Sequence, residues 1–332
     1  MCLKGASAAR ATRSASTPSV LTLTDAHLWA ERFNGDTSDL FGLQDEITSR
    51  IAIALNLELV AAEAAQVTQN PDALDYVLRG RSALSKPASR ESYAEAISAF
   101  ERALALDPDS VDARSWLAVV LVHRILNFGS SSSDSDVQRS DTLANQAVAA
   151  APRSPLAHYA KGQVLRAQRR CAEAIPEYET ALALDRNSVH ALAAIGRCKI
   201  YVGPIEEGIP LQEQAILLSP RDPNIFLWYF RIGEAHLLQS HIDEAILWFE
   251  KSRGANAGWP SIHAWLASAY ALKGETERAV AKLAEARSLG GEGSWSSIAR
   301  SRANTRYETP AIRALAEATY YAGLRKAGVP EE

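Results

Sequence analysis

The chain has 332 residues, a length that corresponds to about two domains of roughly 150 residues or to one elongated array. Its 35 basic and 39 acidic residues give a formal net charge of −4, which argues against a general binder of nucleic acids or anionic membranes. Hydrophobic residues make up 47% and charged residues 22%, as in chains that bury a core. Three cysteines, Cys2, Cys171 and Cys198, are too few for a disulfide framework, so we expect a cytoplasmic protein.

Residues 1–24 contain basic residues and no acidic ones among many Ser, Ala and Thr residues. They lack the apolar stretch of ~7–15 residues that a secretory signal needs. Their composition favours a disordered leader, and an organelle transit peptide is the alternative. The longest apolar run of the chain, Trp116–Val122, is far shorter than the ~18 residues that span a bilayer, so we expect no membrane span.

Residues 25–66 predict a short strand followed by a long amphipathic helix. The strand pattern, for one or two short strands, begins upstream with Val20, Leu21 and Leu23 among threonines and continues over residues 28–33, and a turn signal follows at Asn34–Asp36. A strand and a helix cannot bury both apolar faces by themselves, so the rest of the chain, a partner or a missing piece of a domain must cover them. A second copy of the chain could also pair with the helix. Its apolar stripe, with steps of three and four, is Leu40, Leu43, Ile47, Ile51, Leu55 and Leu59.

Small residues recur at intervals close to 34 residues, which indicates an internal repeat. One ladder has spacings of 44, 34, 34, 37 and 34: Ala103, Ala147, Ala181, Ala215, Ser252 and Ala286. Seven residues earlier, a second ladder has the same spacings: Ala96, Ser140, Ala174, Gly208, Ala245 and Ala279. Mostly bulky residues lie between them: Phe100, Ala144, Tyr178, Gln212, Phe249 and Leu283. A further small ladder comes earlier in each unit: Gly80, Ala118, Gly162, Gly196, Gly233 and Ala267.

This pattern is typical of stacked pairs of antiparallel helices. Small residues let two backbones approach, the bulky residue fills the gap to the neighbouring unit, and a proline such as Pro108, Pro152 or Pro220 ends the second helix. The pattern resembles the tetratricopeptide repeat (TPR), which has small and aromatic residues at fixed positions in a 34-residue period. The resemblance implies an all-α superhelix. Its six units are 73–110, 111–154, 155–188, 189–222, 226–259 and 260–293, with capping helices over 294–332.

Two units depart from the pattern. In the second, residues 128–136 form a polar stretch that predicts a flexible loop between its helices. In the fourth, Gln212 replaces the aromatic residue and Pro210 falls inside the second helix. Because proline removes a helix hydrogen bond, we expect this unit to be bent or loosened.

The flanks carry a second resemblance. His27–Asp36 and Asp39–Ile47 are similar to the junction before the TPR array in bacterial multidomain class III adenylate cyclases, and Gly323–Pro330 is similar to the end of those proteins. In that family a cyclase domain and a small α/β domain precede the repeats. The resemblance implies that residues 25–66 are the remnant of the α/β domain and that the catalytic domain has no counterpart in this chain.

No constellation in the sequence predicts catalysis, a metal or a cofactor. His236 and His241 are five residues apart and do not share a helix face as zinc ligands would. Cys171 and Cys198 lie in different units without a second ligand nearby and are expected to be buried small residues. Residues 290–293 are glycine-rich, but they lack the lysine and the preceding strand of a phosphate-binding loop.

The TPR resemblance implies that the first helix of each unit lines a concave groove. Arginine and aromatic residues at such positions suit a peptide ligand, with an acidic segment or a C-terminal carboxylate as the partner's contribution. Solvated or inter-helix packing roles are the alternative, and the aromatic residues are also plausible core. The groove residues predicted in this way are Tyr159, Gln163, Arg166, His190, Arg197, Tyr201, Phe230, Arg231, Glu234, Trp265 and Ser268.

The sequence therefore predicts a non-enzymatic TPR module for protein–protein interaction or scaffolding, the regulatory part of a cyclase-type signalling protein. One alternative is an adenylate or guanylate cyclase family member whose catalytic domain is missing from this chain. Another is a module that self-associates through the Leu40–Leu59 stripe.

Overall fold

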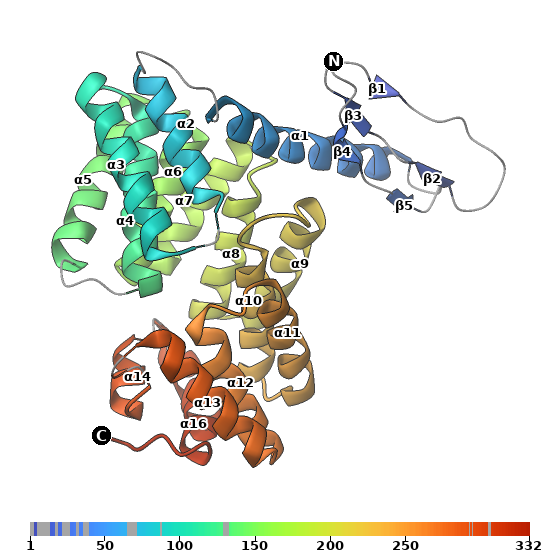
Figure 1. The fold of residues 1–332 in the computed structure, drawn as a ribbon, viewed down its shortest axis with the longest axis vertical. Helices are drawn as coiled ribbons and strands as arrows, with labels where there is room; N and C mark the ends of the chain where they lie inside the picture. Colours follow the sequence, from blue (N-terminus) through green and yellow to red (C-terminus); the bar gives the residue numbers. More distant parts are fainter. Residues whose placement is uncertain are drawn as a thin grey trace.

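The computed structural model describes a helical array preceded by short strands (Figure 1). The described residues are 3–4, 14–16, 19–21, 27–30, 33–35, 40–64, 72–86, 88–128, 133–291, 293, 295–304 and 307–332.

Six helix pairs form the array. Five of them pack most extensively within the pair, and the first helix of the fourth pair packs equally on its own partner and on the third pair. Each pair matches one of the predicted units, so the all-α repeat architecture is confirmed. The helices of the first three pairs are α2 (Ala73–Leu84), α3 (Arg90–Leu106), α4 (Val111–Phe128), α5 (Ser133–Ala150), α6 (Pro155–Ala167) and α7 (Cys171–Leu184). Those of the last three are α8 (Val189–Val202), α9 (Gly208–Leu218), α10 (Ile225–Leu238), α11 (Ile242–Ala255), α12 (Pro260–Lys273) and α13 (Thr276–Gly290).

A seam of tight contacts joins the two helices of a pair. The aromatic rings of Phe100, Tyr178 and Phe249 are fully buried. Each ring lies directly against the glycine of its own first helix, where a Cβ atom would overlap the ring. The pattern predicted that the bulky residue fills the gap to the neighbouring unit, and two of the rings also reach that unit: Phe100 stacks with Trp116, and Phe249 lies beside Trp265. Glycine is required here because any side chain would push the two helices apart.

The fourth pair has a different seam. Gln212 is buried, and its Nε2 donates a hydrogen bond to the Ala193 carbonyl at 2.6 Å. The expectation for Pro210 was wrong, because a 3₁₀ turn, η1 (Ile205–Glu207), precedes α9 and leaves this proline in the first helical turn. Backbone N–H groups of a first turn have no partner within the helix, so proline removes no helical hydrogen bond there.

The two cysteines of the array lie next to each other. Cys171 begins α7 and Cys198 lies on α8, and their Sγ atoms are 3.0 Å apart as free thiols. Both are buried, as expected. The sequence indicated no second ligand near either cysteine, but each thiol is the neighbour of the other. The packing of α7 on α8 brings them together, and sequence distance does not report such a contact.

Helices at the carboxyl end close the last pair. They are α14 (Ile298–Asn304), α15 (Pro310–Ala316), the π-helical turn η2 (Glu317–Tyr321) and α16 (Ala322–Lys326). The Tyr320 ring stacks on Trp265 with 3.9 Å between centroids, and the Tyr320 carbonyl accepts a hydrogen bond from Ser268 Oγ. The inner face of α12 is therefore covered by the chain itself.

Helix α1 (Leu40–Ala64) lies at the other end of the array and contacts α2 and α9 (Figure 1). The face that packs on the repeats carries Ile53 and Val60, which are both buried. Ile53 shares a cluster with Val189 and Trp228. The predicted stripe is on another face: within the described side chains, Ile47, Ile51 and Leu55 form a small half-buried cluster, and Leu59 is 47% exposed. Both faces of α1 are apolar, so the periodicity identified only one of them.

Short strands precede α1 and form two small antiparallel sheets, β1–β3–β4 and β2–β5. They are β1 (Leu3–Lys4), β2 (Ser14–Ser16), β3 (Ser19–Leu21), β4 (His27–Ala30) and β5 (Phe33–Gly35). The strand expected over residues 28–33 corresponds in part to β4. β1 and β2 fall within residues 1–24, which were expected to be a disordered leader, whereas β3 contains Val20 and Leu21, where a strand was expected. Asn34 and Gly35 lie in β5 instead of a turn. These strands form through hydrogen bonds between backbone groups, and side-chain composition does not predict such pairing.

The polar stretch at residues 128–136 also differs from the expectation. Helix α5 begins at Ser133, so the second half of the stretch is the first turn of a helix. Asp134 and Asp136 lie in that turn, where acidic side chains interact favourably with the helix dipole. Residues 129–132 lie outside the described part of the chain.

Candidate ligand-binding groove

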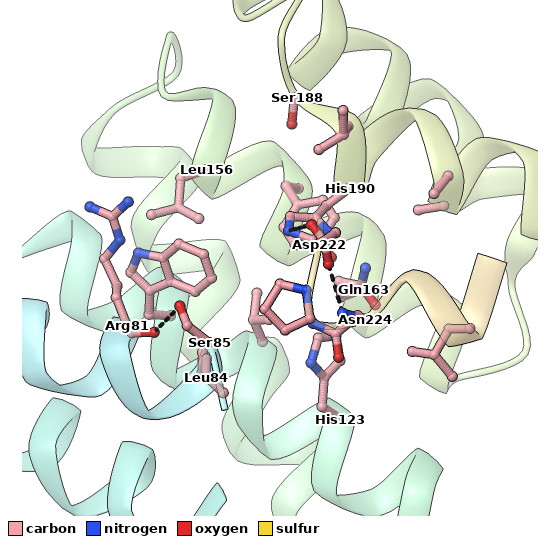
Figure 2. A pocket seen from close by; sticks show the side chains of 18 of the residues that line it. Arg81, Leu84, Ser85, His123, Leu156, Gln163, Ser188, His190, Asp222 and Asn224 are labelled. Carbon is pink, nitrogen blue, oxygen red and sulfur yellow. Dashed lines mark hydrogen bonds and ion pairs between the residues drawn. The ribbon is translucent and has the colours of Figure 1, made fainter. Parts of the chain in front are cut away.

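A cavity of about 620 Å³ lies on the concave side of the array. The first helices of the first five pairs line it, together with α1, α9 and the loops before α8 and α10. Figure 2 shows side chains from these separate elements gathered around one space, among them Arg81, His123, Gln163 and His190. The volume lies within the range of about 300–1,000 Å³ that is usual for ligand pockets.

Two arginines on the cavity wall, the buried Arg166 and the half-buried Arg197, lack a carboxylate partner among the described residues. Arg166 is 2% exposed, and both its Nε and Nη2 donate to the Gln163 side-chain carbonyl. Its Nη1 is buried without any hydrogen-bond partner among the described atoms. Arg197 donates only to the Tyr201 hydroxyl, at 3.3 Å, and lies over the ring of that tyrosine. Burial of an unpaired positive charge is unfavourable, so these side chains need an anion from elsewhere.

The third arginine of the predicted strip is neutralised within the protein. Arg231 forms an ion pair with Glu234, and Glu234 also accepts a hydrogen bond from the Tyr307 hydroxyl at 2.7 Å. Burial alone lowers the pKa of Arg231, but the Glu234 carboxylate raises it above its ordinary value. Arg231 therefore contributes less free positive charge to the cavity than Arg166 and Arg197 do.

The pKa values of the wall record this crowding of positive charge. Burial, followed by the nearby charges of Arg166 and Arg231, lowers the pKa of Arg197 to about 10. Burial and the Arg166 charge lower the pKa of His123 to about 3, so His123 is neutral at physiological pH. An anion bound between these groups would be stabilised by the same positive field.

Three aromatic side chains form a row along the wall. Tyr159 on α6, His190 on α8 and Trp228 on α10 have successive ring-centroid distances of 6.4 and 6.1 Å. His190 Nε2 lies 3.6 Å from Asp222 Oδ2, an interaction drawn in Figure 2. Tyr159 and Trp228 are buried, whereas the His190 side chain is 41% exposed. The row gives the cavity a partly apolar side on which successive rings are tilted by 42° and 59°.

The structure brings part of the predicted groove together. Tyr201 and Glu234 lie behind the wall, where they hold Arg197 and Arg231. Phe230 packs in the core against Phe249 and Trp259, so its assignment to the groove was wrong. Of the predicted groove residues, six line the cavity: Tyr159, Gln163, Arg166, His190, Arg197 and Arg231.

The sixth unit was predicted to contribute to the groove, but its predicted residues do not line the cavity. Trp265 and Ser268 are covered by the carboxyl-terminal helices, which occupy the inner face of α12. Helix positions alone could not show this, because the covering residues come from about 50 positions later in the chain.

Several wall residues were missed by the sequence reasoning. On α4, Asp112, Trp116 and His123 occupy positions 2, 6 and 13 of the second unit and line the cavity. The rule that identified Arg166 and Arg197 would have found them. Trp228 has no such signal because it occupies position 3, and no sequence signal placed Asn56 of α1 near Arg81, whose Nη2 donates to it at 3.2 Å.

Within the described residues, no group of three or more His, Cys, Asp or Glu side chains could hold a metal ion. In the same part of the chain, none of the helices combines the length and the apolar character needed to cross a bilayer.

The sequence matches the family model of the tetratricopeptide repeat over residues 88–124 and 134–189. A relative from Rhizobium meliloti (strain 1021), named "Putative adenylate cyclase 3", is 30% identical over 155 residues. The match covers 46% of this chain and 26% of that relative, so the chain spans about a quarter of the relative's length.

Solved structures of repeat proteins share the fold. Human IFIT1, solved as a dimer with m7Gppp-AAAA, has a TM-score of 0.55 and 19% identity over 71% of this chain and 57% of its own. Cut9, in the APC/C hetero-tetramer Cut9-Hcn1, has a TM-score of 0.55 and 16% identity over 76% of this chain and 46% of its own. At these identities the likeness concerns the fold alone.

Proposed function

Because residues 88–124 and 134–189 match the family model of the tetratricopeptide repeat, we propose that this chain is a non-enzymatic interaction module whose concave groove binds an acidic segment or free C-terminal carboxylate of a partner protein. The observation that carries the proposal is the pair Arg166 and Arg197, which lie buried and half-buried, respectively, on the groove wall without a carboxylate partner among the described residues. Guanidinium groups bind carboxylates through directed, charge-assisted hydrogen bonds. A partner carboxylate would supply the charge that the wall lacks.

The experiment compares binding of synthetic peptides to the wild-type chain and to Arg166→Ala/Arg197→Ala. Four peptides share one core sequence and differ in two features. Each carries or lacks a glutamate run, and each ends in a free carboxylate or an amide. Each charge-assisted contact contributes roughly 1.5–3 kcal/mol, so the double variant should lose most of the binding energy. Binding should also weaken as salt is added, because partly exposed charges are screened.

A matched control is Arg287→Ala, which removes an exposed arginine that donates only to the Trp295 carbonyl. We expect its peptide affinity to equal that of the wild type. If both arginine variants bind every peptide as the wild type does, the binding surface lies elsewhere, and the exposed part of the Leu40–Leu59 stripe is the next surface to test.

We further propose that the module regulates a cyclase-type signalling protein. The similarity to part of an adenylate cyclase relative supports this role, and it also favours the alternative that the chain belongs to a cyclase whose catalytic part lies outside it. An assay of the purified chain with ATP or GTP and Mg²⁺ or Mn²⁺ separates catalysis from regulation. Cyclic-nucleotide formation that a single carboxylate substitution abolishes would overturn the non-enzymatic proposal.

A further inference from the structure

We propose that the part of the groove covered by α1 binds a small phosphate ester that carries a planar ring, as a nucleotide does. The phosphate would contact Arg166 and Arg197, and the ring would lie along Tyr159, His190 and Trp228. This goes beyond the proposed partner binding, since it gives the deep part of the groove a ligand that needs no second protein.

Charge is the first argument. Arg166 and Arg197 both face the cavity without an acidic partner among the described residues, and the positive charges of Arg166 and Arg231 act on Arg197. A terminal carboxylate supplies one negative charge, whereas a phosphate monoester supplies nearly two in one compact group. Its oxygens can also accept several hydrogen bonds at once, including one from the unpartnered Arg166 Nη1.

The aromatic row is the second argument. Tyr159, His190 and Trp228 come from three successive first helices and give one side of the cavity a row of aromatic rings, tilted by 42° and 59° from one ring to the next. Stacking of a nucleic-acid base on an aromatic side chain is worth about 1–3 kcal/mol, whichever base is involved. A ring-bearing ligand can therefore use both the row and the guanidinium groups.

Enclosure is the third argument. Ile53, Asn56 and Val60 of α1 line the cavity opposite the repeats, and Asn56 is tied to Arg81 by a hydrogen bond. An extended peptide must share the groove with this helix. A small molecule can occupy the space of about 620 Å³ that remains beneath it.

The test is isothermal titration calorimetry of the intact chain with AMP, adenosine, inorganic phosphate and the acidic peptides described above. We expect AMP to bind and to raise Tm. Adenosine and phosphate should each bind with an affinity lower by about tenfold or more, since each makes only half of the contacts. Arg197→Met should lose AMP binding by about tenfold or more.

Folding of that variant is checked by its own melting temperature. Arg197→Met removes a half-buried charge that has no acidic partner among the described residues, and it keeps an unbranched side chain, so its Tm without ligand should be equal to or higher than that of the wild type. The matched control is Arg153→Met, which makes the same substitution at an exposed residue before α6 and should leave AMP affinity unchanged.

The outcomes separate the two proposals. Absence of heat and of a Tm shift with AMP overturns the phosphate-ester site, and if the acidic peptides still bind, the proposed partner binding stands. Equal affinity for AMP and inorganic phosphate overturns the role of the aromatic row. Unchanged AMP affinity in Arg197→Met overturns the role of the guanidinium. If AMP binds as expected and no peptide does, the phosphate-ester site stands and the partner proposal fails.

Discussion

The seam inside each helix pair and the wall of the groove are built from opposite kinds of contact. At the seam, Tyr178 presses its fully buried ring against Gly162, and the neighbouring ladder positions are alanines with no exposed surface. On the wall, the buried Arg166 and the half-buried Arg197 lie beside other positive groups without acidic partners among the described residues. Apolar contact stabilises the first region, and uncompensated charge destabilises the second.

This difference separates what the array needs for folding from what it offers to a ligand. Nothing in the repeat geometry requires arginine on the wall, since an apolar or uncharged side chain of similar length could fill the same space. Charged groups that are retained despite their desolvation penalty are candidates for function. Changes at the seam should therefore reduce stability, whereas changes on the wall should alter binding and pH dependence.

The largest effect is expected from overpacking the seam. Ala181→Trp places an indole where the side chain has no exposed surface, and it should lower the free energy of unfolding by about 3 kcal/mol or more. Ala183→Trp makes the same change two residues later on α7, at an exposed position, and should alter stability by less than about 0.5 kcal/mol. Chemical denaturation measures both, and equal losses would mean that the seam is not where the ladder places it.

The seam could be predicted from sequence because its requirements are local and repeat with a fixed period. Gly162, Tyr178 and Ala181 satisfy the same steric constraint as their counterparts in other units, so the pattern reinforces itself along the chain. The wall could be predicted only in part. Its helix positions follow the same period, which located Arg166 and Arg197.

The segments that cover the inner face of the array lie outside the repeats, and their contacts do not follow the repeat period. The carboxyl-terminal Tyr320 removes Trp265 from the groove by stacking on it. Helix α1 turns Ile53 and Asn56 toward the cavity, on a face that the apolar stripe did not identify. Both contacts join segments far apart in the chain, and a single sequence without a repeated constraint gives no signal for them.

On the wall, an intermediate effect is expected from His123 as the pH falls. Its pKa is lowered to about 3 by burial and by the charge of Arg166, whereas the unfolded chain has an ordinary value of about 6.5. Between these values the unfolded state binds more protons, so the free energy of unfolding should decrease as pH falls through this window, by up to about 2 kcal/mol at pH 5. Above pH 6.5 the effect should vanish.

The variant His123→Gln isolates this contribution because glutamine does not titrate. The measured quantity is the free energy of unfolding of the variant minus that of the wild type. Compared with its value at pH 8, this difference should increase progressively as the pH falls below 6.5. Other titrating groups act on both proteins and cancel in the comparison. Parallel stability curves across the whole range would show that His123 is not held neutral by the positive wall.

The smallest effect concerns one polar atom inside the seam. The Tyr178 hydroxyl is buried and has no hydrogen-bond partner among the described atoms, although the ring beneath it fits closely against Gly162. A buried hydroxyl without a partner loses its hydrogen bonds to water and gains none in return. Tyr178→Phe keeps the ring and removes this penalty, so the free energy of unfolding should rise by about 1 kcal/mol. Tyr229→Phe, at a partly exposed tyrosine of α10, is the control and should change stability by less than about 0.5 kcal/mol. If Tyr178→Phe is instead the less stable protein, the hydroxyl has a partner in solution. The seam would then share the polar character of the wall, and the contrast between the two regions would be smaller than their contacts indicate.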